Sequence, residues 1–197
     1  MAKVKVLIEG YAREEGDYEI ASCTTTLIQD KDLNIIVDPG MNRKLLLDSL
    51  KKENLSINNI HYVILTHTHI DHCLLAGIFE NAEIIDDSSV YSFEGKIRDH
   101  EGKVPGTNIK LIKTPGHDPF HCAVLIKTIK SGNIVISGDV FWWPDSEENK
   151  IKKDAKSLIN LKDPYMKDKK QLTDSRKKIL KIADYIIPGH GKMFKVS

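Results

Sequence analysis

The chain has 197 residues, of which 41% are hydrophobic and 29% charged, and its formal net charge is +1. This composition is ordinary for a globular protein, and the length favours one domain, so residues 1–197 are expected to form a single unit. No apolar run approaches the roughly 20 residues that span a bilayer, so no membrane partner is expected. The three cysteines lie far apart without CxxC spacing. That spacing fits reduced thiols in a cytoplasmic protein rather than a disulfide framework.

Short runs rich in Val, Ile and Thr predict nine strands along the chain. They are expected at Val4–Ile8, Ser22–Ile28, Leu33–Val37, Tyr62–Leu65, Glu83–Ile85, Ile109–Ile112, Cys122–Ile126, Ile134–Ile136 and Tyr185–Ile187. Helical spacing of apolar residues is found at Asn42–Lys52, Asp71–Phe79 and Ser175–Ala183. Residues 144–173 are polar and rich in Lys and Asp, which predicts a surface loop with one short helix. Strands first, then strands mixed with helices, predict an α+β protein whose sheets are covered by helices.

Ligand-type residues are concentrated in Thr66-His67-Thr68-His69-Ile70-Asp71-His72, directly after the strand predicted at Tyr62–Leu65. Residues two apart in an extended segment point the same way, so His67 and His69 can hold one ion together. Asp71 and His72 lie past the turn and can face a second ion. Imidazole and carboxylate together suit zinc, iron or manganese. Burying these four side chains without a shared partner would be costly, so the run predicts a metal site.

Three further positions repeat one local pattern, in which an apolar strand is followed by a tight glycine turn and then by one ligand-type residue. The three residues are His117 after Thr114-Pro115-Gly116, Asp139 after Ser137-Gly138, and His190 after Pro188-Gly189. Glycine lets the backbone turn sharply and approach a site closely. Each position is a weak signal alone, but four strand ends that each present metal-ligand chemistry predict one shared centre.

The combined pattern of His67, His69, Asp71, His72, His117, Asp139 and His190 resembles the ligand set of the metallo-β-lactamase superfamily, from Thr26 to the C-terminus. The resemblance implies a four-layer αβ/βα sandwich with two metals at one edge between the sheets. It assigns the first metal to His67, His69 and His117, and the second to Asp71, His72 and His190, with Asp139 as the bridge. Two zinc ions are expected, with iron or manganese as alternatives. The turn Asp38-Pro39-Gly40 also resembles a family motif, in which the Asp has a structural role.

The resemblance implies metal-assisted hydrolysis with Asp71 and Asp139 as catalytic residues. The segments Gly138–Phe141, Ser175–Leu180 and Ile187–Gly191 are similar to a subgroup associated with endonucleolytic cleavage of RNA. A phosphodiester in RNA or single-stranded DNA is therefore the first expected substrate. The alternatives are a small carboxylic ester, thioester, lactone or β-lactam, or a metal-binding interaction module without activity. The oligomeric state does not follow from the sequence.

Charge is unevenly distributed along the chain. Residues 150–181 hold twelve Lys or Arg against four acids, whereas residues 1–149 hold fifteen against twenty-three. A basic stretch of this kind is either a solvated helix face or a surface for an anionic partner. The residues expected to contact nucleic acid are Lys152, Lys153, Lys156, Lys169, Lys170, Arg176, Lys177 and Lys178. Lys177 and Lys178 are singled out because their predicted helix leads toward His190.

Four other residues are candidates because they follow metal ligands in the sequence. His121 lies four residues past His117, and Trp142 and Trp143 follow Asp139. These three are predicted to contact substrate, with a position behind the ligands as the alternative for His121, although tryptophan is more often a core residue. Cys73 directly follows His72 and is expected to pack at the start of a helix, with contact to the second metal as the alternative.

Overall fold

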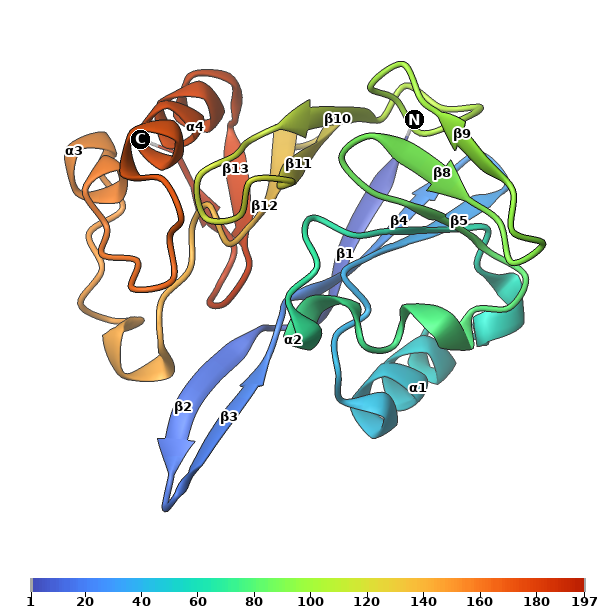
Figure 1. The fold of residues 1–197 in the computed structure, drawn as a ribbon, viewed down its shortest axis with the longest axis horizontal. Helices are drawn as coiled ribbons and strands as arrows, with labels where there is room; N and C mark the ends of the chain where they lie inside the picture. Colours follow the sequence, from blue (N-terminus) through green and yellow to red (C-terminus); the bar gives the residue numbers. More distant parts are fainter. Residues whose placement is uncertain (1, 197) are drawn as a thin grey trace.

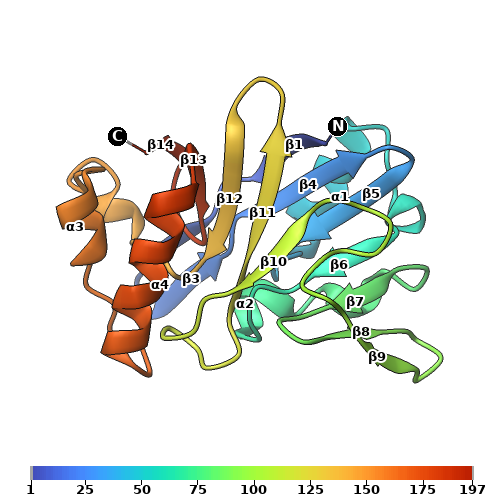
Figure 2. The same cartoon turned by 90° about the horizontal axis from the view of Figure 1, so that it is seen from above.

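The computed structural model describes residues 2–196, in which two β-sheets face each other and helices cover their outer faces (Figure 1, Figure 2). The first sheet has seven strands in the order β1-β4-β5-β6-β7-β8-β9, and the second has five in the order β10-β11-β12-β13-β14. A separate ribbon, β2-β3, projects from the body of the molecule (Figure 1). Within residues 2–196, no helix is long and apolar enough to cross a bilayer.

The bounds of the elements are as follows. The first sheet contains β1 (Lys3–Ile8), β4 (Thr25–Asp30), β5 (Leu33–Val37), β6 (Tyr62–Ile64), β7 (Glu83–Ile85), β8 (Ser89–Tyr91) and β9 (Ile97–Asp99). The second contains β10 (Lys110–Lys113), β11 (Cys122–Thr128), β12 (Gly132–Gly138), β13 (Tyr185–Pro188) and β14 (Phe194–Lys195). The ribbon is β2 (Tyr11–Glu15) and β3 (Tyr18–Ser22). The α-helices are α1 (Arg43–Lys52), α2 (Ile70–Cys73), α3 (Ala155–Ile159) and α4 (Lys169–Ile182), and short 3-10 helices cover Ile57–Asn59, Ala76–Ile78 and Asp145–Glu147.

Three hydrophobic cores separate four layers. Successive side chains of a strand point to opposite faces of its sheet, so a strand buried on both faces is apolar at consecutive positions. In β4, Ile28 packs in the core between the sheets, whereas Leu27 packs with Leu46 of α1. In the second sheet, Ile136 faces the first sheet, and Val135 belongs to the core that the helices α3 and α4 cover. The predicted α+β class and the helix–sheet–sheet–helix layering are confirmed.

The ends of four strands meet at one edge of the sandwich. The parallel pairing of β12 with β13 places Gly138 opposite Pro188, and the backbone N–H of Gly189 donates to the carbonyl of Gly138 at 2.9 Å. Across the two sheets, the N–H of Cys122 donates to the carbonyl of Thr66 at 2.8 Å. The loops that follow β6, β10, β12 and β13 are therefore held side by side.

Several predicted boundaries were wrong for identifiable reasons. The run Ser22–Ile28 is interrupted at Cys23 and Thr24, because their N–H groups donate to the carbonyls of Asp71 and Gly189 instead of to a neighbouring strand. The helix predicted at Asp71–Phe79 is only the four-residue α2 followed by a 3-10 turn, because the Leu75 N–H donates to the Gly40 carbonyl.

The last helix begins six residues earlier than predicted, at Lys169. Asp168 caps it, with a carboxylate oxygen that accepts from the Gln171 N–H at 2.9 Å. The ribbon β2-β3 and the strands β8, β9 and β14 were not predicted. β2 and β3 carry several exposed charges, and their side chains do not show the burial pattern on which strand prediction depends.

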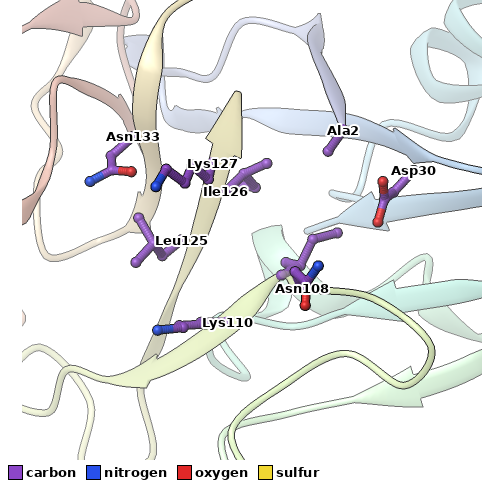
Figure 3. A pocket seen from close by; sticks show the side chains of 9 residues that line it. Ala2, Asp30, Asn108, Lys110, Leu125, Ile126, Lys127 and Asn133 are labelled. Carbon is purple, nitrogen blue, oxygen red and sulfur yellow. The ribbon is translucent and has the colours of Figure 1, made fainter. Parts of the chain in front are cut away.

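A cavity of about 470 Å³ lies at the opposite edge of the sandwich, among strand ends that carry no ligand-type cluster (Figure 3). It is lined by Asp30 at the end of β4, by Lys110 at the start of β10 and by Leu125–Lys127 of β11. Leu125 and Ile126 point to opposite faces of β11, where Ile126 belongs to the core between the sheets and Leu125 packs against the core under the helices.

Gly116 precedes the candidate ligand His117 and packs against α4. Its substitution therefore tests how the fold holds the predicted metal site. Its φ is +133°, and an added Cβ would overlap the backbone of Leu172 in α4. We expect Gly116→Ala to lower the free energy of unfolding by at least about 3 kcal/mol, since backbone overlap adds to conformational strain. Gly95 is the matched control, because its φ is also positive but nothing lies within 4 Å of an added Cβ. Gly95→Ala should cost only about 1 kcal/mol. Equal losses in urea unfolding would contradict this account of Gly116.

Candidate metal centre

Asp38 anchors the loop that follows β6. It is 1% exposed, and its Oδ1 accepts from the Thr66 N–H at 2.8 Å. Its Oδ2 accepts from the Thr66 hydroxyl at 2.7 Å and lies 2.9 Å from Nδ1 of His72. One buried carboxylate therefore fixes both ends of the segment Thr66–His72, and with them the direction of the histidines between.

The first group of ligand-type atoms comes from His67, His69, His117 and Asp139, whose atoms all lie within 4.8 Å of one another. Nε2 of His117 is 3.2 Å from Nδ1 of His69 and 3.4 Å from Oδ2 of Asp139. Nε2 of His67 is 3.9 Å from the same carboxylate oxygen. Zinc–nitrogen bonds of about 2.0–2.1 Å place two ligands of a tetrahedral ion about 3.4 Å apart, so these separations fit one ion.

The second group consists of Asp71, His72 and His190. Nε2 of His190 is 3.1 Å from Oδ2 of Asp71, and Nε2 of His72 is 3.8 Å from that oxygen. Oδ1 of Asp139 is 3.2 Å from Nε2 of His72 and 3.8 Å from Nε2 of His190. Asp139 thus directs one oxygen to each group. The structure brings all seven sequence-predicted ligand residues together in two groups with a shared carboxylate.

Buried polar atoms without a hydrogen-bond partner are the sign that these residues fit cations. Nε2 of His67, Nε2 of His72 and Oδ1 of Asp139 are all buried and unpartnered. The last two are close but are not aligned for a hydrogen bond. Buried polar groups in native proteins are nearly always satisfied. Atoms left open at the centre of a cluster of imidazoles and carboxylates are suited to divalent transition metals.

His67 and His72 have opposite electrostatic surroundings. Burial lowers the pKa of His67 well below its usual value. Burial also opposes charge on His72, but Asp139 and Asp38 together raise the pKa of His72 well above its usual value. Burial alone would raise the pKa of Asp139, yet the imidazoles of His72 and His190 hold it well below its usual range. The Asp139 side chain is therefore an ionised carboxylate, which is the form that binds a cation.

The ring nitrogens that face away from the cluster have partners from distant parts of the chain. Nδ1 of His190 is 3.1 Å from the carbonyl of Tyr11, in the unpredicted ribbon β2-β3. Nδ1 of His117 is 2.7 Å from Oδ2 of Asp163. Asp163 lies in the stretch 144–173, and its only sequence signal is the dipeptide Asp163-Pro164. That stretch was predicted as a surface loop with one short helix, but Asp163 is 4% exposed. Such outer contacts fix the orientation of metal-binding histidines.

Two of the predicted substrate contacts are wrong, because their side chains are buried behind the site. His121 is 1% exposed, its ring stacks on His67 with centroids 5.0 Å apart, and burial lowers the pKa of His121 to about 3. Trp143 is 2% exposed, and its indole N–H donates to Glu148 at 2.7 Å. Trp142 is only partly buried, and its ring lies 6.0 Å from His190 and 5.6 Å from Tyr165. Of the three candidates, Trp142 alone lies beside the cluster and is partly open to solvent.

The basic stretch is partly internal. Arg176 is 3% exposed, and its guanidinium donates to the carbonyls of Val140, Ile159 and Leu161. Lys153 lies 3.5 Å from the centre of the Trp143 ring and is half-buried there. The prediction that Arg176 and Lys153 belong to a free basic surface was therefore wrong. Both serve to pack the segment around α3 against the second sheet.

Lys177 and Lys178 are exposed, and they lie further along α4 than the point where the helix meets Gly116. Helix α4 passes the cluster near its first turns, where Leu172 meets Gly116, and Lys177 lies about 7.5 Å further along the helix axis. Nζ of Lys177 is 3.9 Å from Asp174, and Nζ of Lys178 donates to the Lys113 carbonyl at 3.1 Å.

Cys73 does not join the second group. Its thiol donates to the carbonyl of Thr68 at 3.4 Å, and it shares no ligand group with Asp71 or His190. This geometry agrees with packing at the start of α2.

Comparison with known proteins identifies the family. Residues 20–90 match the profile of the metallo-beta-lactamase superfamily. Over 98% of its length the chain is 33% identical to metallo-beta-lactamase domain-containing protein 1 of Xenopus laevis, of which it covers 81%. The chain belongs to the metallo-β-lactamase superfamily.

Other members of the superfamily indicate the class of chemistry. The chain is 33% identical, over 95% of its length and 86% of the relative, to a protein of Methanocaldococcus jannaschii named as a probable metallo-hydrolase. A solved dizinc quorum-quenching lactonase in complex with a product has a TM-score of 0.64 and 18% identity, covering 88% of this chain and 74% of the lactonase. That likeness shows the shared fold. The chain is a metal-dependent hydrolase of the metallo-β-lactamase superfamily.

The contacts of Asp38 predict its contribution to stability. Asp38→Asn replaces Oδ2, which faces two donors, with an NH₂ group, so buried donors lose their acceptor. We expect unfolding of metal-free protein, measured in a chelator, to become easier by about 2–3 kcal/mol. Asp48→Asn is the control, because Asp48 forms an exposed pair with Lys44 and should cost no more than about 0.5 kcal/mol. Similar small losses for both variants would show that Asp38 does not anchor the loop.

Proposed function

We propose that this hydrolase works with two zinc ions, one held by His67, His69 and His117 and the other by Asp71, His72 and His190. The observation that carries the proposal is the position of Asp139, whose Oδ2 lies 3.4 Å from His117 and whose Oδ1 lies 3.2 Å from His72. A carboxylate with one oxygen toward each group is what a bridging ligand requires. Iron or manganese would suit the same donors.

Two such cations, when bound, lower the pKa of water toward neutrality and polarise a carbonyl or phosphoryl oxygen. The chain's own residues supply the rest of the chemistry. Asp139 is nearly buried and keeps the two groups at a fixed separation, whereas the side chain of Asp71 is 23% exposed. Asp71 can therefore accept a hydrogen bond from an attacking water at the open side of the cluster. We assign it that orienting role.

A phosphodiester in RNA or single-stranded DNA is our first choice of substrate. Its support in the structure is the segment 162–170, in which Asp163 lies beside His117 and the side chains of Tyr165, Lys167, Lys169 and Lys170 are exposed. The N–H of Lys167 donates to the Gly116 carbonyl at 2.8 Å, so this segment lies against the site loop. Lysines beside an exposed aromatic ring suit a nucleic-acid strand, because cations contact phosphates and a ring can stack on a base.

A small ester, thioester or lactone is the second candidate, and a different observation favours it. Ile70 and Phe120 each lie within three residues of a ligand position and are 62% and 70% exposed. Apolar side chains beside the cluster suit an acyl chain. The dizinc lactonase of the same fold acts on a substrate of this kind. Turnover by metal-loaded protein on RNA, single-stranded DNA, a lactone and a thioester would separate the two candidates.

Removal of Asp139 tests the two-metal proposal. We expect elemental analysis to find two transition metals per wild-type chain and no more than one in Asp139→Ala, with most activity lost and the circular dichroism spectrum retained. The physical reason is that nothing else holds both ions at the separation of about 3.5–4 Å typical of such sites. Asp87→Ala is the control, because Asp87 is also buried but belongs to neither group. Two metals retained in Asp139→Ala would contradict the bridging role of Asp139. At most one metal in the reloaded wild type would contradict the two-metal site.

Charge reversal on α4 and its preceding segment tests the choice of substrate. We expect Lys167→Glu with Lys170→Glu to weaken RNA binding at least about tenfold and to lower the salt dependence by about 0.7 per lost contact. Lys177→Glu with Lys178→Glu changes net charge equally but further from the cluster, and should have a much smaller effect. Hydrolysis of a small neutral ester should change little in either variant. If both pairs leave RNA cleavage unaltered, the ester or lactone candidate moves ahead.

A further inference from the structure

We propose that Asp163 and Arg176 form a buried positioning assembly for His117, in which Asp163 orients the imidazole and Arg176 holds the segment that carries Asp163. The inference rests on the proposed metal site and assigns a role to two residues outside the ligand set. Neither residue touches the reacting atoms, so both act through His117.

The contact between Asp163 and His117 is short and excluded from water. Oδ2 of Asp163 lies 2.7 Å from Nδ1 of His117, and both side chains are fully buried. A carboxylate accepts and cannot donate, so Nδ1 must carry the proton and Nε2 is left with a free lone pair. Nε2 is the nitrogen that faces His69 and Asp139, at 3.2 and 3.4 Å. Asp163 thus selects the tautomer of His117 that can bind a cation.

The other oxygen of Asp163 is used to fix the carboxylate itself. Oδ1 accepts from the N–H of Tyr165 at 3.0 Å. The carboxylate plane is therefore held at both ends, by the backbone on one side and by His117 on the other. Such outer partners raise the basicity of a ligand histidine and fix its ring.

Arg176 connects this segment to the loop after β12, which carries Asp139. Its Nε donates to the carbonyl of Val140, the residue after Asp139, at 3.0 Å. Its Nη1 donates to the carbonyls of Leu161 at 2.7 Å and Ile159 at 3.3 Å, just before Asp163. A planar guanidinium presents several donors in a rigid fork, which suits one residue that joins two segments. The geometry of Asp163 relative to Asp139 therefore depends on Arg176.

The segment is also held at its far end. The N–H groups of Lys167 and Asp168 both donate to the carbonyl of Gly116, next to His117, at 2.8 and 2.9 Å. Leu158 of α3 is fully buried in the core under α4. The chain between α3 and α4 is thus fixed before and after Asp163, which gives that carboxylate one position.

The test uses Asp163→Asn in the full-length protein. We expect competition with a chelator to show that one of two zinc ions binds about 10–100-fold more weakly, the range for loss of such a partner. The visible spectrum of Co²⁺ bound in that site should change. The unfolding midpoint of metal-free protein should stay near that of wild type, because the amide oxygen still accepts from the Tyr165 N–H and a metal-free imidazole can accept from the new NH₂ group. Arg176→Lys, which keeps the charge but not the fork, should cause a smaller loss of affinity in the same site.

Asp86→Asn is the matched control. Asp86 also accepts from backbone N–H groups and, at 2.6 Å, from the Tyr91 hydroxyl, but it contacts no ligand histidine. The Asp86→Asn variant should leave both zinc affinities and the Co²⁺ spectrum unchanged. Wild-type zinc affinity and a wild-type Co²⁺ spectrum in Asp163→Asn would overturn this inference but not the proposed function. The inference would also be overturned if both zinc ions bound equally more weakly and the unfolding midpoint fell, because that result indicates a structural role for Asp163. A wild-type chain that binds no cation would overturn the proposed function and this inference with it.

Discussion

The cost of burying imidazoles and carboxylates is the constraint on which the rest of the structure depends. His67, His72 and Asp139 are almost inaccessible to water and hold polar atoms without protein partners. Buried charged groups of this kind are tolerated when they share a partner of opposite charge. The two proposed cations would supply that partner for the inner atoms. The fold must supply partners for the outer atoms, since a half-satisfied polar cluster would be worse than an apolar one.

The outer partners come from parts of the chain that are far apart in sequence. Asp38 follows β5, Tyr11 belongs to the ribbon β2-β3, and Asp163 lies between α3 and α4. Each holds the nitrogen of one histidine that faces away from the cluster. Both halves of the sandwich and the segment once predicted as a surface loop therefore contribute to a single centre. This dependence explains why residues with no ligand role, such as Arg176, are buried with their charge.

Substrate selection depends on surfaces that the ligand set does not determine. The segment 162–170 brings lysines and Tyr165 next to the loop of His117, whereas the exposed end of the ribbon β2-β3 is acidic. The two surfaces flank the same cluster, since Tyr11 contacts His190 and Asp163 contacts His117. A polyanion would be attracted to one side and repelled from the other. For the proposed nucleic-acid substrate, this asymmetry would favour a path along the side of α4.

The sequence by itself determined which seven ligand-type residues gather at one edge, most of the central strands and the class of fold. It could do so because the ligands follow apolar strands at fixed local spacing, and local patterns are readable from a single chain. Tertiary structure alone decided that Asp163 faces His117 and that Arg176 and Trp143 are internal. Those outcomes depend on contacts between residues separated by tens of positions. Burial of a charged or aromatic side chain is a property of what packs over it, and no spacing in the sequence encodes that.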